Sequence, residues 1–376
     1  MTRAHLLSLA LGLVLSAAGA EAALRLFAPQ DTLAQLHANN PAMFVASDWL
    51  PYALRPGYRG RLRRREFDVA VTIDSAGYRG PELGPAGRRF RILAIGDSFT
   101  FGFGVEDSES YPSRLAQILA GRNVEVINAG FAAGYYPDTY YLYLRRRGLE
   151  LAPDLIVVGF FVGNDIDHRR LGENRWLAVD DAGLPLAITN LDKKVEAGYL
   201  LPRGLPLRYE IPLLRDSHVF QLVASHVAAL RRVAPSRPRR AEEATGPIPW
   251  NYRPTYAART ERAVRNVQRL FLGMRALAGR TPLVVLMIPE RIQVGPPPPG
   301  WDVDKPQRIF RRFFREKRIA FLDLLPQIRA EAAPVSLYFP IDRHFNRRGQ
   351  DFAARRLAAF LVHRDLVPPA PRAIPR

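Results

Sequence analysis

Beyond Arg91 the chain repeats one pattern, in which a short run of apolar residues is followed by a stretch with helical features. The apolar runs span residues 91–96, 124–128, 155–161, 283–288 and 319–322. Strands that are apolar along their whole length must be buried on both faces, as happens when helices cover both sides of a parallel sheet. We therefore predict an α/β fold with a central parallel sheet.

Helices are expected between these strands. Pro112, just inside Ser110 and Tyr111, is typical of the first turn of a helix. The predicted helices span about 111–120, 138–147, 256–278, 305–316 and 348–362.

Other parts of the chain interrupt this pattern. Residues 67–73 alternate between apolar and polar as a half-buried strand does, so we expect a small β-rich extension before the main domain rather than a linker. A Leu-, Pro- and Arg-rich stretch after the third strand indicates an insertion or lid, or a surface loop. The predicted organisation is an N-terminal segment (1–27), an extension (28–89), a main domain (90–366) with an insertion at about 169–253, and a tail (367–376).

The N-terminal segment has the features of an export signal, because Arg3 precedes an apolar stretch of 15 residues, Leu6–Ala20. Small residues at positions 18 and 20, or at 20 and 22, would suit a signal peptidase, whereas continuation to Phe27 would give an uncleaved anchor. Glu21 is an obstacle to spanning, since 15 residues fall short of the roughly 20 that a bilayer requires. A single Glu near the far interface costs less, so the anchor and the cleaved signal both stay open. A buried N-terminal helix of a cytosolic protein is the third interpretation. We expect export to the periplasm or anchoring in the inner membrane, facing outward.

Composition excludes several classes of function. The formal charge is +18, but all but four of the 54 basic residues are Arg and they are scattered along the chain. A polyanion or membrane surface stays open as a partner, whereas the absence of aromatic interleaving and of zinc-ligand spacing argues against nucleic acid. The chain has no Cys, which excludes a thiol nucleophile, a thiolate metal site and disulfides.

Short motifs follow the predicted strands. Gly96-Asp97-Ser98 comes directly after the first strand, at the sheet edge where the active-site crevice of such folds opens. A serine there suits a nucleophile, although Gly-Asp-Ser is also an ordinary turn. Gly130 follows the second strand and Asn164 the third, so their N–H groups are expected to converge with Ser98 as an oxyanion hole.

His344 lies in a loop before the last predicted helix, two residues after Asp342. A histidine there can accept the proton of a serine, and the carboxylate can hold its tautomer. The alternative is a structural histidine that caps the helix.

The four motifs, taken in order, resemble those of the SGNH or GDSL hydrolase superfamily over about 91–362, with the insertion unmatched. The resemblance implies that Ser98 is the nucleophile, that the Ser98 backbone, Gly130 and Asn164 form the oxyanion hole, and that His344 and Asp342 are base and acid. Many members place the acid three residues before the histidine, and here the gap is two. Residues 74–80 also resemble a segment of membrane-tethered bacterial members that are associated with surface polysaccharides.

This resemblance implies a three-layer α/β/α fold of flavodoxin type and an acyl-serine intermediate. It implies no cofactor. Asp165, Asp167 and His168 suggest a metal site at first sight, but we interpret them as adjacent surface polar residues.

Several functions stay open from the sequence. The first is an exported esterase that removes acyl groups, with acetyl expected, from an envelope or extracellular glycan. The second is an O-acyltransferase on a cell-envelope polysaccharide, in which the insertion would exclude water. A third is a non-catalytic glycan-binding or assembly protein, and a fourth is a lipid-directed esterase whose acyl pocket Phe99, Phe101 and Phe103 would line.

Overall fold

The computed structural model describes most of the chain in two compact units. One unit comprises Met1–Ala42 and Leu191–Thr245, and the other comprises Met43–Asn190 and Gly246–Arg376. The described residues are 2–30, 32, 41–85, 87, 89–167, 169–172, 176–189, 193–202, 211, 214–233 and 249–370.

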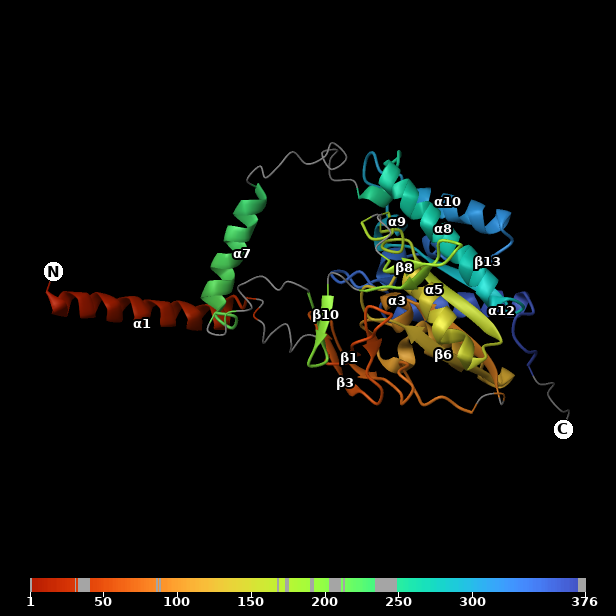
Figure 1. The fold of residues 1–376 in the computed structure, drawn as a ribbon, viewed down its shortest axis with the longest axis horizontal. Helices are drawn as coiled ribbons and strands as arrows, with labels where there is room; N and C mark the ends of the chain where they lie inside the picture. The colour runs from red at the N-terminus through yellow and green to blue at the C-terminus, as the bar shows by residue number, and fades with distance from the viewer. Residues whose placement is uncertain are drawn as a thin grey trace. The chain divides into compact units, whose positions relative to one another are not determined.

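The larger unit is built on a five-stranded sheet in which every neighbouring pair is parallel (Figure 1). Its strands are β5 (Phe90–Gly96), β6 (Val124–Gly130), β7 (Leu155–Phe161), β12 (Leu283–Ile288) and β13 (Ala320–Asp323). They lie in the order β13-β12-β7-β5-β6. Counted along the chain this is the order 2-1-3-4-5, which is that of flavodoxin-like folds. The predicted parallel sheet and its fold type are confirmed.

Helices cover both faces of this sheet, and the side chains of β7 pack against the helices on each face. Leu155 and Val157 belong to the core cluster that includes α4 (Tyr111–Ile118) and α12 (Arg347–His363), whereas Phe160 contacts Phe271 of α8 (Ala258–Ala278) and Phe310 of α10 (Lys305–Glu316). Successive side chains of a strand point to opposite faces, so a strand covered on both sides must be apolar throughout. The main helices are α4 (Tyr111–Ile118), α5 (Pro137–Arg146), α8 (Ala258–Ala278), α10 (Lys305–Glu316) and α12 (Arg347–His363).

Shorter elements connect these helices and strands. The one-turn helices are α3 (Ser98–Phe101), α9 (Arg291–Val294) and α11 (Leu325–Arg329). The 3-10 turns are η1 (Asp107–Glu109), η2 (Ala120–Arg122), η3 (Gly148–Leu151), η5 (Trp250–Tyr252) and η6 (Pro334–Leu337). The predicted helices and strands of the main domain are confirmed with small shifts at their ends. The long helix, for example, begins at Ala258 instead of 256.

Two antiparallel pairs precede β5 in the larger unit. They are β1 (Phe44–Val45) with β2 (Ala53–Leu54), and β3 (Arg59–Arg64) with β4 (Phe67–Thr72). In β4 the apolar residues Phe67, Val69 and Val71 are buried and Asp68 is exposed, as the alternating sequence predicts. A third antiparallel pair, β8 (Ala178–Val179) with β9 (Pro185–Ala187), also belongs to this unit.

The smaller unit contains α1 (Arg3–Phe27), the hairpin of β10 (Lys193–Glu196) and β11 (Tyr199–Pro202), and α7 (His218–Val233). The stretch predicted as one insertion thus contributes to both units. Within α1, residues Ala4–Phe27 form a helix that is long and apolar enough to cross a membrane, and no part of its most apolar stretch is buried. This helix continues past Glu21, which the sequence had suggested as the end of the apolar stretch. Of the predicted tail, residues 371–376 lie outside the described part of the chain.

Candidate active site

Ser98 lies at the turn between β5 and α3, where it is the first residue of the short helix. The Asp97 carboxylate accepts a hydrogen bond from the Phe99 amide at 2.9 Å and so caps this helix. The turn is tight, because a Cβ at Gly96 would lie 2.0 Å from Thr100 Oγ1 and 3.1 Å from the Gly159 carbonyl. A glycine is therefore required beneath the serine.

The structure brings Ser98, His344 and Asp342 into one hydrogen-bonded chain. Ser98 Oγ lies 2.7 Å from His344 Nε2, and His344 Nδ1 lies 2.5 Å from Asp342 Oδ1. With the Nδ1 proton donated to the carboxylate, Nε2 is left to accept the hydroxyl proton of Ser98.

The short spacing between Asp342 and His344 has a structural explanation. Arg343, the residue between them, has φ +72°, in the left-handed region that non-glycine residues rarely adopt. This conformation turns the chain back on itself, so that a carboxylate only two residues away reaches the histidine ring.

Two effects compete at the Asp342 carboxylate. Burial works against its ionisation, but the hydrogen bonds from His344 and the nearby charge of Arg64 outweigh burial and lower the pKa of Asp342 below its usual value. Asp342 is therefore ionised at neutral pH, as a group that stabilises an imidazolium must be.

Asn164 lies beside Asp97 at the carboxyl ends of β7 and β5. Its Nδ2 atom donates to Asp97 Oδ2 at 3.0 Å. A carboxylate accepts only from the amide nitrogen, so Asp97 fixes which end of the Asn164 amide faces it and leaves one N–H hydrogen for another acceptor. Burial raises the pKa of Asp97 to about 6, despite the hydrogen bonds from the Phe99 amide and from Asn164.

Gly130, the third predicted donor of the oxyanion hole, makes a hydrogen bond within its own strand. Its N–H donates to Asn128 Oδ1 at 3.0 Å, so it already has an acceptor. A Cβ at this position would lie 2.2 Å from the Phe101 amide nitrogen. The absence of a side chain thus allows β6 to approach the backbone of α3 closely. The role of Gly130 as an oxyanion donor stays a prediction.

A known protein family matches the stretch of sequence that contains these residues. Residues 94–352, more than two thirds of the chain, match the GDSL-like lipase/acylhydrolase family. The chain belongs to this family. The predicted superfamily is thereby confirmed, and the match spans from the nucleophile strand to the last helix. No match was found among curated proteins.

Solved structures with a similar fold share little sequence with this GDSL family member. A lipase/acylhydrolase from Enterococcus faecalis is 13% identical, with 75% of this chain and 99% of that chain covered and a TM-score of 0.41. A G-D-S-L family lipolytic protein from Veillonella parvula is 10% identical, with coverages of 72% and 98% and a TM-score of 0.37. A two-domain esterase active on acetylated mannans is 12% identical, with coverages of 77% and 54% and a TM-score of 0.39.

The β3–β4 hairpin contacts the loop that carries the acid and the histidine, which the sequence did not predict. The Glu66 carboxylate, in the hairpin turn, accepts from the Ile341 amide at 3.0 Å and from the Asp342 amide at 2.6 Å. Phe67 packs on Phe339 with ring centroids 5.1 Å apart. The extension of this family member thus holds the backbone of the predicted catalytic acid.

Arg79 makes a second link from the extension to the site, and its side chain is fully buried. Its guanidinium donates to the carbonyls of Phe101, Gly102 and Val105 and to Asp107 Oδ1. It also lies over the Phe101 ring, 4.5 Å from the centroid. These contacts fix the loop that follows the nucleophile. The 74–80 segment, noted in the sequence for its resemblance, is where this arginine lies.

Three phenylalanines follow the nucleophile, and they differ in environment. Phe99 and Phe101 are 2% and 0% exposed, so they belong to the core. Phe103 is partly exposed, and its ring centroid lies 5.0 Å from that of His344.

Asp165 is buried, contrary to its interpretation as a surface residue, and accepts hydrogen bonds from Tyr140 Oη and the Phe161 amide. Burial raises the pKa of Asp165 well above its usual value. His168 lies outside the described residues. Among those described, no group of three His, Cys, Asp or Glu side chains could hold a metal ion.

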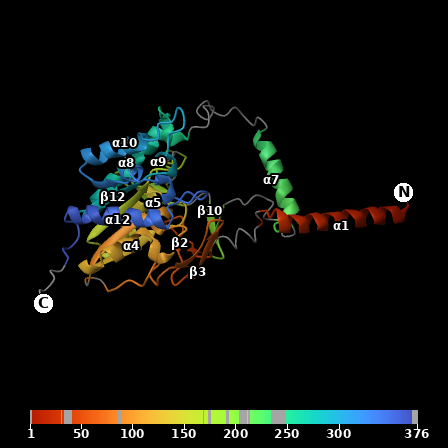
Figure 2. The same cartoon turned by 180° about the vertical axis from the view of Figure 1, so that it is seen from behind.

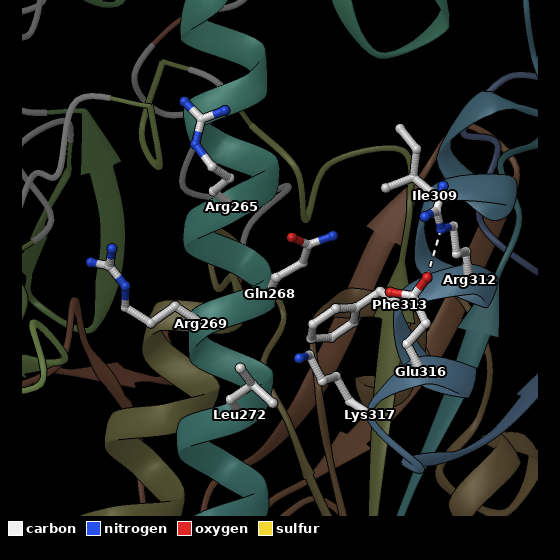
Figure 3. Close-up of a pocket in the computed structure, with 9 residues that line it drawn as sticks. All are labelled: Arg265, Gln268, Arg269, Leu272, Ile309, Arg312, Phe313, Glu316 and Lys317. Carbon is white, nitrogen blue, oxygen red and sulfur yellow. Dashed lines mark hydrogen bonds and ion pairs between the residues drawn. The ribbon is translucent and has the colours of Figure 1, made fainter.

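A pocket of about 570 Å³ lies between α8 and α10 (Figure 3). Basic side chains line much of it, including Arg265, Arg269, Arg312 and Lys317, and Arg312 pairs with Glu316. None of the predicted site residues lines this pocket.

Proposed function

We propose that the protein is a serine esterase that removes acyl groups, chiefly acetyl, from an envelope or extracellular glycan. The observation that carries this proposal is the continuous chain of contacts from Ser98 Oγ through His344 to Asp342. Membership of an acylhydrolase family supports the same class of reaction.

In the proposed mechanism, Ser98 Oγ attacks the carbonyl carbon of the ester while His344 Nε2 takes the hydroxyl proton. Collapse of the tetrahedral intermediate breaks the bond from carbonyl carbon to sugar oxygen, and the imidazolium gives its proton to that oxygen. Water then attacks the acyl-serine with His344 again as base, releasing the acid and restoring Ser98. Asp342, ionised throughout, stabilises the imidazolium.

The oxyanion of the tetrahedral intermediate requires donors at about 2.7 to 3.1 Å. We assign this role to the backbone N–H of Ser98 and the second amide hydrogen of Asn164. The N–H of Gly130, the third predicted donor, would have to leave Asn128 Oδ1 to serve the oxyanion.

The environment of the nucleophile supports a small acyl group. Ser98 is 8% exposed, and Phe99 and Phe101 are buried, so neither ring offers an exposed surface to a fatty acyl chain. The lipid-directed alternative depended on Phe99, Phe101 and Phe103, and it keeps support from Phe103 alone, which is partly exposed beside His344.

The N-terminal helix supports a location outside the cytoplasm. Residues Ala4–Phe27 have the length and composition of a membrane span. We propose that they anchor the enzyme in the inner membrane with the catalytic unit facing outward, where acylated glycans are accessible.

Acyl release from two series of substrates tests this function. We expect the purified chain to release acetate from acetylated glycans, and to hydrolyse short-chain p-nitrophenyl esters faster than long-chain ones. Ser98→Ala and His344→Ala should abolish both activities. Faster turnover of long-chain esters, or hydrolysis that survives Ser98→Ala, would contradict the proposal. Acyl transfer to an added sugar in place of release to water would indicate the O-acyltransferase instead.

A further inference from the structure

Glu21, a charged residue inside the apolar helix α1, has its hydrogen-bonding partners at the start of α7. Its carboxylate accepts from Ser217 Oγ at 2.9 Å, from the His218 amide at 2.9 Å and from the Val219 amide at 3.0 Å. It also pairs with Arg25, one turn further along α1. The carboxylate thus satisfies amides at the beginning of α7, which intrahelical bonds leave unpaired.

The position of Glu21 along α1 determines the depth in the membrane at which α7 begins. Eighteen residues separate Arg3 from Glu21, which corresponds to about 27 Å of helix. The hydrocarbon core of a bilayer is about 30 Å thick. If Arg3 lies at one surface of the membrane, Glu21 and the first turn of α7 therefore lie at the other.

α7 runs crosswise to α1 from this point, as the two opposite views agree (Figures 1 and 2). A helix that crosses a spanning helix at the membrane surface extends along that surface. α7 is long enough for this, since it comprises 16 residues.

The side of α7 that faces the membrane follows from His218. Its Nδ1 atom accepts from the Gln30 amide at 2.8 Å, and Gln30 lies beyond Phe27, the last residue of α1. His218 therefore faces away from the spanning part of α1. Val223 and Val227 are about 140° and 180° further round the helix by its 3.6-residue period, so they face back toward the membrane.

These two valines are exposed in the structure, Val223 by 55% and Val227 by 41%. Ser225, which is also exposed, lies roughly 160° away from both of them by the same period. α7 therefore exposes two valines on one side and a serine on the other, and such a separation is typical of helices that lie in the membrane interface.

We infer that α7 is an interfacial helix, which lies on the outer surface of the same bilayer that α1 spans and inserts Val223 and Val227 among the lipids. This inference rests on the proposed anchoring by α1. Glu21 couples the two helices, because its carboxylate holds the beginning of α7 at the membrane surface.

Site-directed fluorescence tests the inference directly, because the chain has no native cysteine. Val223→Cys, Val227→Cys, Ser225→Cys and Val14→Cys variants of the full chain are labelled with an environment-sensitive fluorophore and reconstituted into phosphatidylcholine and phosphatidylglycerol vesicles. Nitroxide groups near the lipid headgroups act as quenchers. Ser225 is the matched control on α7, and Val14 reports on the anchoring of α1 with a nitroxide deep in the acyl chains.

We expect the labels at positions 223 and 227 to be quenched several-fold more than the label at 225. Equal quenching at the three positions, with the label at 14 quenched by the deep nitroxide, would overturn the interfacial helix and leave the anchor intact. A label at 14 that lipid does not quench would overturn both. Energy transfer between labels at 223 on different copies, without quenching by lipid, would show that a second copy covers this side and would also overturn the inference.

Glu21→Ala tests the coupling of the two helices. It removes the acceptors for the α7 amides, so the difference in quenching between positions 223 and 225 should fall while position 14 stays quenched. An unchanged difference would overturn the assigned role of Glu21.

Discussion

At the scale of single residues, the conformation of Arg343 allows Asp342 to reach His344. With φ +72° at the intervening residue, a gap of two residues is enough to bring the carboxylate to the histidine ring. The left-handed conformation of Arg343 could not be predicted, because such positions are usually recognised by a Gly or Asn and an Arg occupies this one. The acid could therefore be predicted, whereas the reason for its short spacing could not.

Substitutions of Arg343 test this account. A left-handed conformation costs a non-glycine residue about 1–2 kcal/mol, so Arg343→Gly is expected to keep both the activity and the melting temperature. Arg343→Val, which is branched at Cβ, should lower the stability by about 1–2 kcal/mol and reduce kcat. Thermal unfolding and ester hydrolysis measure both effects. A glycine variant less active than the valine variant would contradict the account.

The buried carboxylate of Asp97 predicts a dependence of stability on pH. Its pKa is raised by burial to about 6 from 3.8, so the folded protein binds a proton there more readily than the unfolded chain does. Ionised Asp97 therefore costs stability above pH 6, and this cost is relieved as the pH falls toward 4. Asp97→Asn, which stays neutral, should be more stable than the wild type at pH 7.5 by about 2–3 kcal/mol, with little difference at pH 4.

The activity of the same variant should change in the opposite direction. Asp97→Asn lacks the oxygen that accepts from Asn164 Nδ2, so the amide loses its fixed orientation and hydrolysis should fall. Melting curves at the two pH values, with kcat at pH 7.5, measure both effects. A stability difference that is the same at both pH values would show that the ionisation of Asp97 has no such role.

At the scale of elements, the order of strands and helices follows from local sequence, whereas the contacts of the extension do not. Runs such as 155–161 and 283–288 are apolar throughout because both their faces are covered, so they could be recognised one at a time. Glu66 and Asp342 are 276 residues apart, and no local pattern relates them. The burial of Asp165 escaped prediction for a similar reason, since its partner Tyr140 is on a different element.

The role of the β3–β4 hairpin is tested by Glu66. Glu66→Ala removes the acceptors for the Ile341 and Asp342 amides, so the acid should lose its position and kcat should fall about tenfold to a hundredfold. Glu66→Gln keeps one carbonyl oxygen and should retain most of the activity. Asp68→Ala, which changes an exposed carboxylate on the same hairpin, is the control.

A merely structural role for Glu66 would give a different result. The alanine variant would then lose melting temperature with kcat preserved in the folded fraction, and the pH profile of kcat/KM would not move. We expect the melting temperature to change little and the acidic limb of the pH profile of kcat/KM to shift.

At the scale of the whole molecule, the predicted site residues lie in one compact unit, Met43–Asn190 with Gly246–Arg376. The other unit contains α1 and α7, to which we assign membrane association. The division of the chain into an extension at 28–89 and an insertion at 169–253 stays a prediction. The two compact units have different boundaries, because stretches that follow one another in the sequence, such as 43–190 and 191–245, belong to different units.

A shortened chain tests this division of labour. It begins at Met43 and joins residue 190 to residue 246 through a flexible Gly/Ser linker of about ten residues. Because Ser98, His344, Asp342 and Asn164 all lie in the larger unit, we expect it to fold and to hydrolyse small acetyl esters at a rate close to that of the full chain. A folded but inactive product would show that the smaller unit contributes to catalysis. If the removed segment excludes water, as predicted for an acyltransferase, hydrolysis should rise relative to transfer.

The central claim is that Ser98 forms an acyl-enzyme with His344 as its base. Mass spectrometry of the protein after reaction with a fluorophosphonate measures this most directly, with peptide mapping to locate the adduct. We predict one adduct on Ser98 in the wild type, none in Ser98→Ala and greatly slowed labelling in His344→Ala. A wild-type protein that releases acetate while Ser98 stays unlabelled, or an adduct on another residue, would contradict the account.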